Sequence, residues 1–83
     1  MHIKKEIIAN IKNILKEKVE NIDDIASDVF LVHSGFIDSI FYVELILRLE
    51  EIYNIEIDFI SDDFDTLTSI DGLSNTILEL VNQ

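Results

Sequence analysis

Cysteine, proline and tryptophan are absent from the 83-residue sequence, and the only glycines are Gly35 and Gly72. Without cysteine the chain has no disulfide, no thiolate metal site and no cysteine nucleophile. Because proline and glycine are scarce, Asp, Asn and Ser must mark most turns and helix ends. No apolar run approaches the roughly 18 residues of a membrane span, and residues 1–10 lack the apolar stretch of a signal peptide. We therefore expect a cytoplasmic protein without membrane insertion.

Basic residues are also scarce, with six Lys and Arg against 17 Asp and Glu and a net charge of −11. Residues 1–18 hold five lysines and two glutamates, whereas residues 19–83 hold one arginine and 15 acids. This balance argues against nucleic acid as a partner, because phosphate binding needs Lys and Arg. The acidic part of the chain is either an ordinary solvated surface or a face that attracts basic partner proteins.

The length allows a single domain over residues 1–83, and a hydrophobic fraction of 48% argues against intrinsic disorder. Apolar residues recur every three or four positions in three stretches, which predicts helices over residues 3–19, 39–53 and 69–81. A short helical turn is expected at residues 61–64, after an extended connection. The fold class is therefore all-α, a bundle of three main helices plus one short one. A long loop, 20–38, joins the first two helices, and apolar side chains are expected to pin it to the core: Ile22, Ile25, Val29, Phe30 and Ile37.

The second predicted helix has two apolar faces. A projection at 100° per residue places a core stripe on one side, made of Tyr42, Leu45, Ile46, Leu49, Ile52 and Tyr53. Phe41 falls on the side that leans toward solvent, and Glu44 faces water. A second apolar stripe consists of Ile40, Val43 and Leu47. Either a neighbouring segment covers this second stripe, or its residues are anchors for a partner.

Asp38 and Ser39 stand at the start of this helix. Asp is a favoured N-cap, and if Asp38 caps the helix then Ser39 is the first helical residue, with an exposed hydroxyl. The positive end of a helix is a favourable place for a phosphate ester. On these grounds Ser39 is either an acceptor for a phosphate-linked group or a plain residue of the first turn. At the last helix, Thr68 and Asp71 loosely match a capping box.

Residues 30–53, FLVHSGFIDSIFYVELILRLEEIY, resemble the prosthetic-group site of acyl carrier and peptidyl carrier proteins. The shared features are Gly35, then Asp38-Ser39-Ile40, and then the Val-Glu-Leu and Leu-Glu-Glu steps at residues 43–45 and 49–51. Residues 64–70, FDTLTSI, resemble the short third helix of that family and the start of its last helix. The likeness extends over essentially the whole chain, in the same order.

The resemblance implies that Ser39 receives 4′-phosphopantetheine from coenzyme A, with Asp38 as its motif partner. The implied protein is a carrier and not an enzyme, without catalytic or metal-binding residues, and it holds an acyl or aminoacyl group as a thioester. Its implied partners are a phosphopantetheinyl transferase, a loading ligase or transferase, and a downstream acyl-accepting enzyme. The residues in the family's docking positions are Ile40, Val43, Glu44 and Leu47. We expect a monomer.

Two features depart from the commonest family pattern. Two residues, Phe36 and Ile37, separate Gly35 from Asp38 where one is usual, and Phe41 and Tyr42 follow the motif. The longer spacing is similar to that of D-alanyl carrier proteins and of some stand-alone carriers. It implies a specialised pathway of lipid, polyketide or nonribosomal peptide synthesis, or D-alanylation, and not housekeeping fatty-acid synthesis.

Three functions other than that of a carrier protein are compatible with parts of the sequence, and two of them are disfavoured. A hydrolytic triad of Ser39, His33 and Asp38 is disfavoured, because a domain of this size offers no deep pocket or obvious oxyanion hole. Calcium binding in an EF-hand loop from Asp63 is rejected, because Thr68 and Ser74 stand where Gly and Glu are needed. The acids that prompted it were Asp62, Asp63, Asp65 and Asp71. The remaining alternative is a small helical adaptor that uses the same exposed stripe and carries no prosthetic group.

Overall fold

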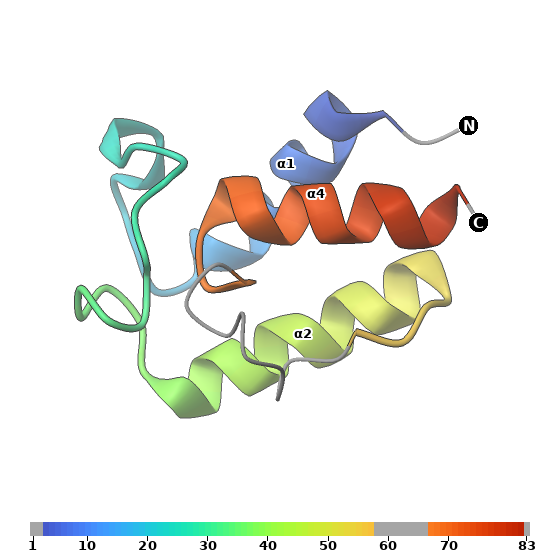
Figure 1. The fold of residues 1–83 in the computed structure, drawn as a ribbon. Coiled ribbons are helices and arrows are strands. Elements are labelled where there is room, and N and C mark those ends of the chain that lie inside the picture. Colours follow the sequence, from blue (N-terminus) through green and yellow to red (C-terminus); the bar gives the residue numbers. More distant parts are fainter. Residues whose placement is uncertain (1–2, 58–66, 83) are drawn as a thin grey trace.

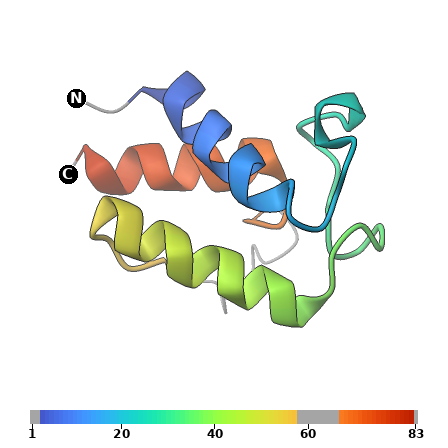
Figure 2. The same ribbon diagram turned by 180° about the vertical axis from the view of Figure 1, so that it is seen from behind.

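A computed structural model of the protein describes residues 3–57 and 67–82. Its elements are α1 (Lys4–Leu15), the 3₁₀ helix η1 (Ile22–Asp24), α2 (Ser39–Tyr53) and α4 (Ile70–Val81). In both views of Figures 1 and 2, α2 and α4 run in the same direction, and α1 runs across them the opposite way. The predicted all-α class with three main helices is confirmed, and the described residues form no strand. The short helix expected at 61–64 lies outside the described residues.

One apolar cluster joins the helices. Its members on α1 and α4 recur every three or four residues, as the periodicity predicts, and they are Ile7, Ile11, Ile14, Leu15, Ile70, Leu73 and Ile77. Burial of each such side chain contributes about 1.5–3 kcal/mol. These helices therefore form because their apolar faces close over a common core with α2, and not because their own propensities suffice.

The first helix is shorter than the apolar pattern predicts. It ends at Leu15, and residues 16–18 form a turn in which Glu17 N donates to Ile14 O at 3.1 Å and Lys18 N to Leu15 O at 3.0 Å. Val19 is buried all the same. The pattern extended to Val19 because a buried residue after the turn continues the spacing of the helix.

The loop between α1 and α2 is fixed to the core at Ile22 and Ile37, as expected, with Ile25 and Val29 half-buried. The prediction for Phe30 is wrong, because its side chain is exposed and Leu31 is buried in its place. Leu31 is held by its backbone: its N–H donates to Thr68 O at 3.0 Å, and its carbonyl accepts from Phe36 N at 3.0 Å. The turn ends at Gly35, whose φ of +83° suits glycine.

Two residues of α2 exchange their predicted places. Phe41 is 5% exposed, whereas Ile52 is 54% exposed. Phe41 belongs to the apolar core cluster, and the Lys18 ammonium on the turn after α1 lies over its ring, 5.8 Å from the centroid. Ile52 lines an open depression with Ile14, Arg48 and Glu51. The helical projection assumes that neighbouring segments cover each side of α2 evenly along its length. It therefore does not distinguish the burial of Phe41 from that of Ile52.

The start of α4 is capped by Ser69 and not by Thr68. Ser69 Oγ accepts a hydrogen bond from Gly72 N at 3.0 Å, and Thr68 is buried. The capping box predicted from Thr68 and Asp71 is therefore wrong: Ser69 caps the helix alone, because the residue three positions later is Gly72, which has no side chain to complete a box. Asp71 forms an ion pair with Lys4 across the helices, at 2.7 Å.

Tyr42 ties α2 to the segment that leads into α4. Its hydroxyl donates to Leu67 O at 3.1 Å, and its side chain is almost fully buried. Burial raises the pKa of the Tyr42 phenol above its ordinary value of 10.0. The hydrogen bond satisfies a hydroxyl that would otherwise be costly to bury.

We predict that Tyr42→Phe lowers the free energy of unfolding by about 1 kcal/mol at pH 8, because Leu67 O loses its donor. The raised pKa keeps the folded phenol protonated, whereas in the unfolded chain it ionises near pH 10. The stability that Tyr42 contributes is therefore present below about pH 10 and is lost as the pH rises further. Urea titrations at pH 8 and pH 11 measure this. A gap between wild type and variant that stays constant or widens at pH 11 would contradict the account.

Candidate functional site

The site begins at the cap of α2. Asp38 has extended backbone angles, with φ of −90° and ψ of 172°, and its Oδ1 accepts a hydrogen bond from Phe41 N at 2.7 Å. Its carbonyl accepts from Tyr42 N at 3.0 Å, the first backbone bond of the helix. The prediction that Asp38 is the N-cap is therefore confirmed. Ser39 is the first residue of α2 and is exposed.

At the start of α2, two backbone N–H groups and the Ser39 hydroxyl lack hydrogen-bond partners among the described residues. Within the described part of the chain, the backbone N–H groups of Ser39 and Ile40 have no acceptor, and the Ser39 hydroxyl makes no hydrogen bond. Unpaired N–H groups give the N-terminal end of a helix its partial positive charge. A negatively charged ester on the Ser39 oxygen would therefore lie at a favourable potential.

The second apolar stripe of α2 is exposed. Ile40 is 81% exposed, Val43 37% and Leu47 56%, and the Glu44 side chain beside them is exposed as well. This exposure agrees with the sequence interpretation, whereas a role in docking remains a prediction. None of these three apolar side chains belongs to the core cluster of the described residues.

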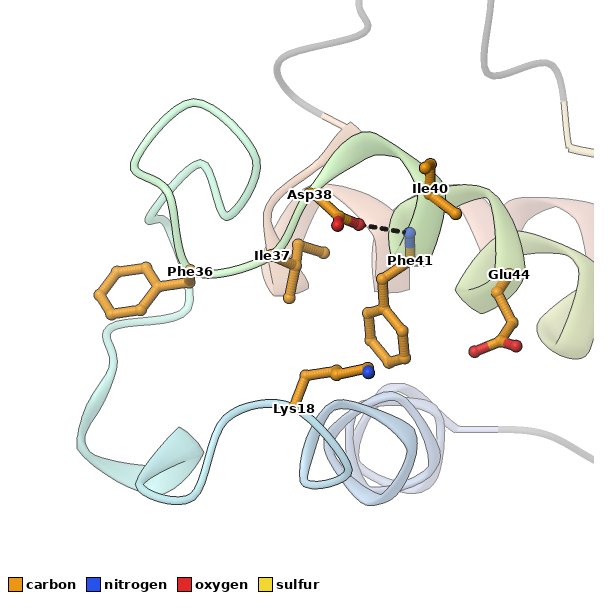
Figure 3. A pocket seen from close by; sticks show the side chains of 7 residues that line it. All are labelled: Lys18, Phe36, Ile37, Asp38, Ile40, Phe41 and Glu44. Carbon is orange, nitrogen blue, oxygen red and sulfur yellow. Dashed lines mark hydrogen bonds between the residues drawn. The ribbon is translucent and has the colours of Figure 1, made fainter.

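A depression of about 380 Å³ lies beside the stripe, between the turn after α1, the end of the long loop and the start of α2. Its lining residues are Lys18, Phe36, Ile37, Asp38, Ile40, Phe41 and Glu44. Figure 3 shows the ring of Phe41 pointing toward Lys18, while the cap bond of Asp38 lies above. Sequence reasoning missed both Lys18 and Phe36 as lining residues. Lys18 comes from a distant segment that only the fold brings to the start of α2, whereas Phe36 lies two residues before Asp38.

An ion pair holds the turn after α1 against α2. Arg48 Nη1 donates to Glu17 Oε2, and this hydrogen bond is the main reason that the pKa of Glu17 is below its ordinary value. Both side chains are about half exposed, so solvent screens the pair and its contribution to stability is small. Arg48 is therefore engaged within the domain.

In residues 3–57 and 67–82, the side chains considered for other functions do not form a site. Within the described residues, Asp38 hydrogen-bonds to the backbone of Phe41, and no hydrogen bond joins the exposed His33 to Ser39 or Asp38. No group of three or more His, Asp or Glu side chains is placed to hold a metal ion in this part of the chain. Of the acids that prompted the calcium hypothesis, Asp62, Asp63 and Asp65 lie outside the described residues.

No protein-family model, curated protein or solved structure matches this chain. The resemblance to acyl carrier proteins thus depends on the motifs of residues 30–70 alone, and membership of that family is not established by comparison. None of the described helices combines the length and the apolarity that are required to cross a bilayer.

We predict that Asp38→Ala lowers the free energy of unfolding by about 1 kcal/mol, because Phe41 N loses its acceptor. Asp38→Asn should retain most of that stability, since an amide oxygen also caps. Ser39→Ala, at an exposed position without a described hydrogen bond, should change it by less than about 0.5 kcal/mol. Urea unfolding of the three variants tests this order. If Ser39→Ala costs as much as Asp38→Ala, Ser39 has a structural role that this account denies.

Proposed function

We propose that this protein is an acyl carrier protein. It holds an activated acyl or aminoacyl group as a thioester on 4′-phosphopantetheine attached to Ser39, and it delivers that group to partner enzymes. We further propose that the protein is a monomer and that it acts in the cytoplasm, in a specialised pathway. The carrier itself performs no chemistry on its cargo, so it serves enzymes as a substrate.

The proposal is supported above all by the different roles of Asp38 and Ser39 at the start of α2. Asp38 supplies the capping bond to Phe41 N, so Ser39 does not have to, and its hydroxyl is exposed at the first position of α2. A residue there is accessible to a modifying enzyme. The helix end also offers unpaired N–H groups to a phosphate ester. The chemistry of this position therefore fits the prosthetic group that the sequence motif implies.

The modification requires an incoming donor and a modifying enzyme. In the transfer, the Ser39 oxygen forms a bond to phosphorus, and a P–O bond within the pyrophosphate of coenzyme A breaks. The hydroxyl proton passes to a base of the phosphopantetheinyl transferase, and adenosine bisphosphate leaves. When bound, the group supplies a thiol that carries the cargo. Since the chain contains no cysteine, that thiol is the only one in the protein that carries phosphopantetheine.

The exposed stripe supports a docking role. Ile40, Val43 and Leu47 provide an apolar patch beside Ser39, and Glu44 adds negative charge at its edge. Partner enzymes with an apolar groove and a basic rim would complement this surface and associate faster for it. The two residues between Gly35 and Asp38 favour a loading enzyme of the D-alanyl type or of a related stand-alone pathway, as the resemblance implies.

Incubation with coenzyme A, magnesium and a broad-specificity phosphopantetheinyl transferase tests the attachment site. We expect the intact mass of the wild type to increase by one phosphopantetheine, and that of Ser39→Ala to stay unchanged. Ser34→Ala, at an exposed serine in the preceding loop, is the matched control and should be modified like the wild type. A wild type that stays unmodified with several such transferases would favour the adaptor without a prosthetic group.

Docking is tested by comparing two leucines of the same helix. Leu47→Ala, at an exposed position, should leave folding nearly intact and reduce the rate of modification by the transferase. Leu45→Ala, at a fully buried position, should cost about 2–5 kcal/mol of stability. Thermal unfolding and the modification rate are measured on both. The docking role is wrong if Leu47→Ala is modified at the wild-type rate, or if it destabilises the fold as much as Leu45→Ala.

A further inference from the structure

We propose that the depression beside the start of α2 is a resting site for the pantetheine portion of the arm on Ser39. This inference depends on the proposed attachment at Ser39 and adds to it a place on the protein where the arm lies between deliveries. The site comprises Lys18 on the turn after α1, Phe36 and Ile37 on the loop, and the first turns of α2 (Figure 3).

Proximity favours this occupant over a free ligand. Asp38 and Ile40, the two chain neighbours of Ser39, both line the depression. A group tethered between them experiences an effective concentration of about millimolar, as for other short flexible linkers. A dissociation constant of about 1 mM for the corresponding free ligand is therefore sufficient to seat the attached arm for about half of the time.

The lining matches the chemistry of pantetheine. The arm contains two amides, each with one donor and one acceptor, and a carbon that bears two methyl groups. Around the depression, the Lys18 ammonium offers donors, and the Asp38 and Glu44 carboxylates offer acceptors. Phe36 and Ile40, whose side chains are exposed, supply apolar surface for the methyl groups.

The charged side chains that line the depression disfavour a charged ligand. One ammonium and two carboxylates repel a free anion overall, and the ammonium disfavours a free cation at its end. Lys18 takes part in none of the ion pairs that the described residues form, and its charge lies over the Phe41 ring. It is therefore available to an uncharged acceptor such as an amide carbonyl.

The position of the site links the arm to docking. Ile40 and Glu44 belong both to the depression and to the surface proposed to meet partners. A partner that covers these two residues competes with the resting arm, so docking itself releases the arm toward the partner. Until then the arm is held on the carrier and is less accessible to solvent.

Backbone amide spectra of the unmodified and the modified protein test the resting site. Modification alone should shift signals near Ser39. A resting arm should also shift Lys18, which lies on the turn after α1 and is distant from Ser39 in the sequence. Intact mass is recorded first: no mass increase refutes the proposed function itself, whereas a mass increase with shifts confined to residues 38–42 refutes only the resting site.

Matched variants separate the arm from a general change in the fold. Phe36→Ala removes a lining residue that is 42% exposed, and Phe30→Ala removes a residue that is 40% exposed in the same loop but outside the lining. Lys18→Gln and Lys16→Gln form a second pair, of which only Lys18 lines the depression. We expect Phe36→Ala and Lys18→Gln to abolish the distant shifts and their two controls to retain them. Equal behaviour within both pairs would overturn the proposal.

The single thiol of the protein that carries phosphopantetheine without cargo provides an independent test. If the arm rests on the protein half of the time, and the thiol is shielded there, its alkylation by iodoacetamide should accelerate about twofold in Phe36→Ala. Phe30→Ala should leave the rate unchanged. An identical alkylation rate in wild type, Phe36→Ala and Phe30→Ala would mean that the depression does not shield the thiol, and would contradict the proposal.

Discussion

The hydrogen bond from Phe41 N to Asp38 Oδ1 sets the first residue of α2, and the other features of the site depend on it. Because the helix begins after Asp38, Ser39 lies at its first position with an exposed hydroxyl. A different start would leave Ser39 as the capping residue, with its oxygen occupied by the backbone. Because the Asp38 carboxylate caps the helix, the Ser39 hydroxyl is left accessible for the proposed modification.

The same start determines which faces α2 presents. One face carries Tyr42, Leu45 and Leu49 into the core, where the Tyr42 hydroxyl fastens α2 to Leu67. On the exposed side, Ile40, Val43 and Leu47 stay accessible. A helix with apolar groups on both sides is held firmly by one of them and is free to meet a partner with the other. The stability of the protein and its proposed recognition of partners thus reside in different side chains of one helix.

Much of this arrangement is predictable from the sequence, because helical periodicity and cap chemistry are local. The bounds of α2, the cap at Asp38 and the exposure of the second stripe follow from residues 38–53 alone. The misplaced residues, Phe41, Ile52 and Phe30, depend on which segment covers each position. The depression that includes Lys18 was not predictable either, since it forms only when the turn after α1 packs against the start of α2.

The central claim is that Ser39 carries the prosthetic group in the cell. Its most direct test is the mass of the peptide that contains Ser39, taken from the protein isolated from the cells that naturally produce it. The account predicts that this peptide bears phosphopantetheine on Ser39, with the cargo still attached in part of the population. A peptide recovered only with an unmodified serine, under conditions that preserve phosphodiesters, would contradict it.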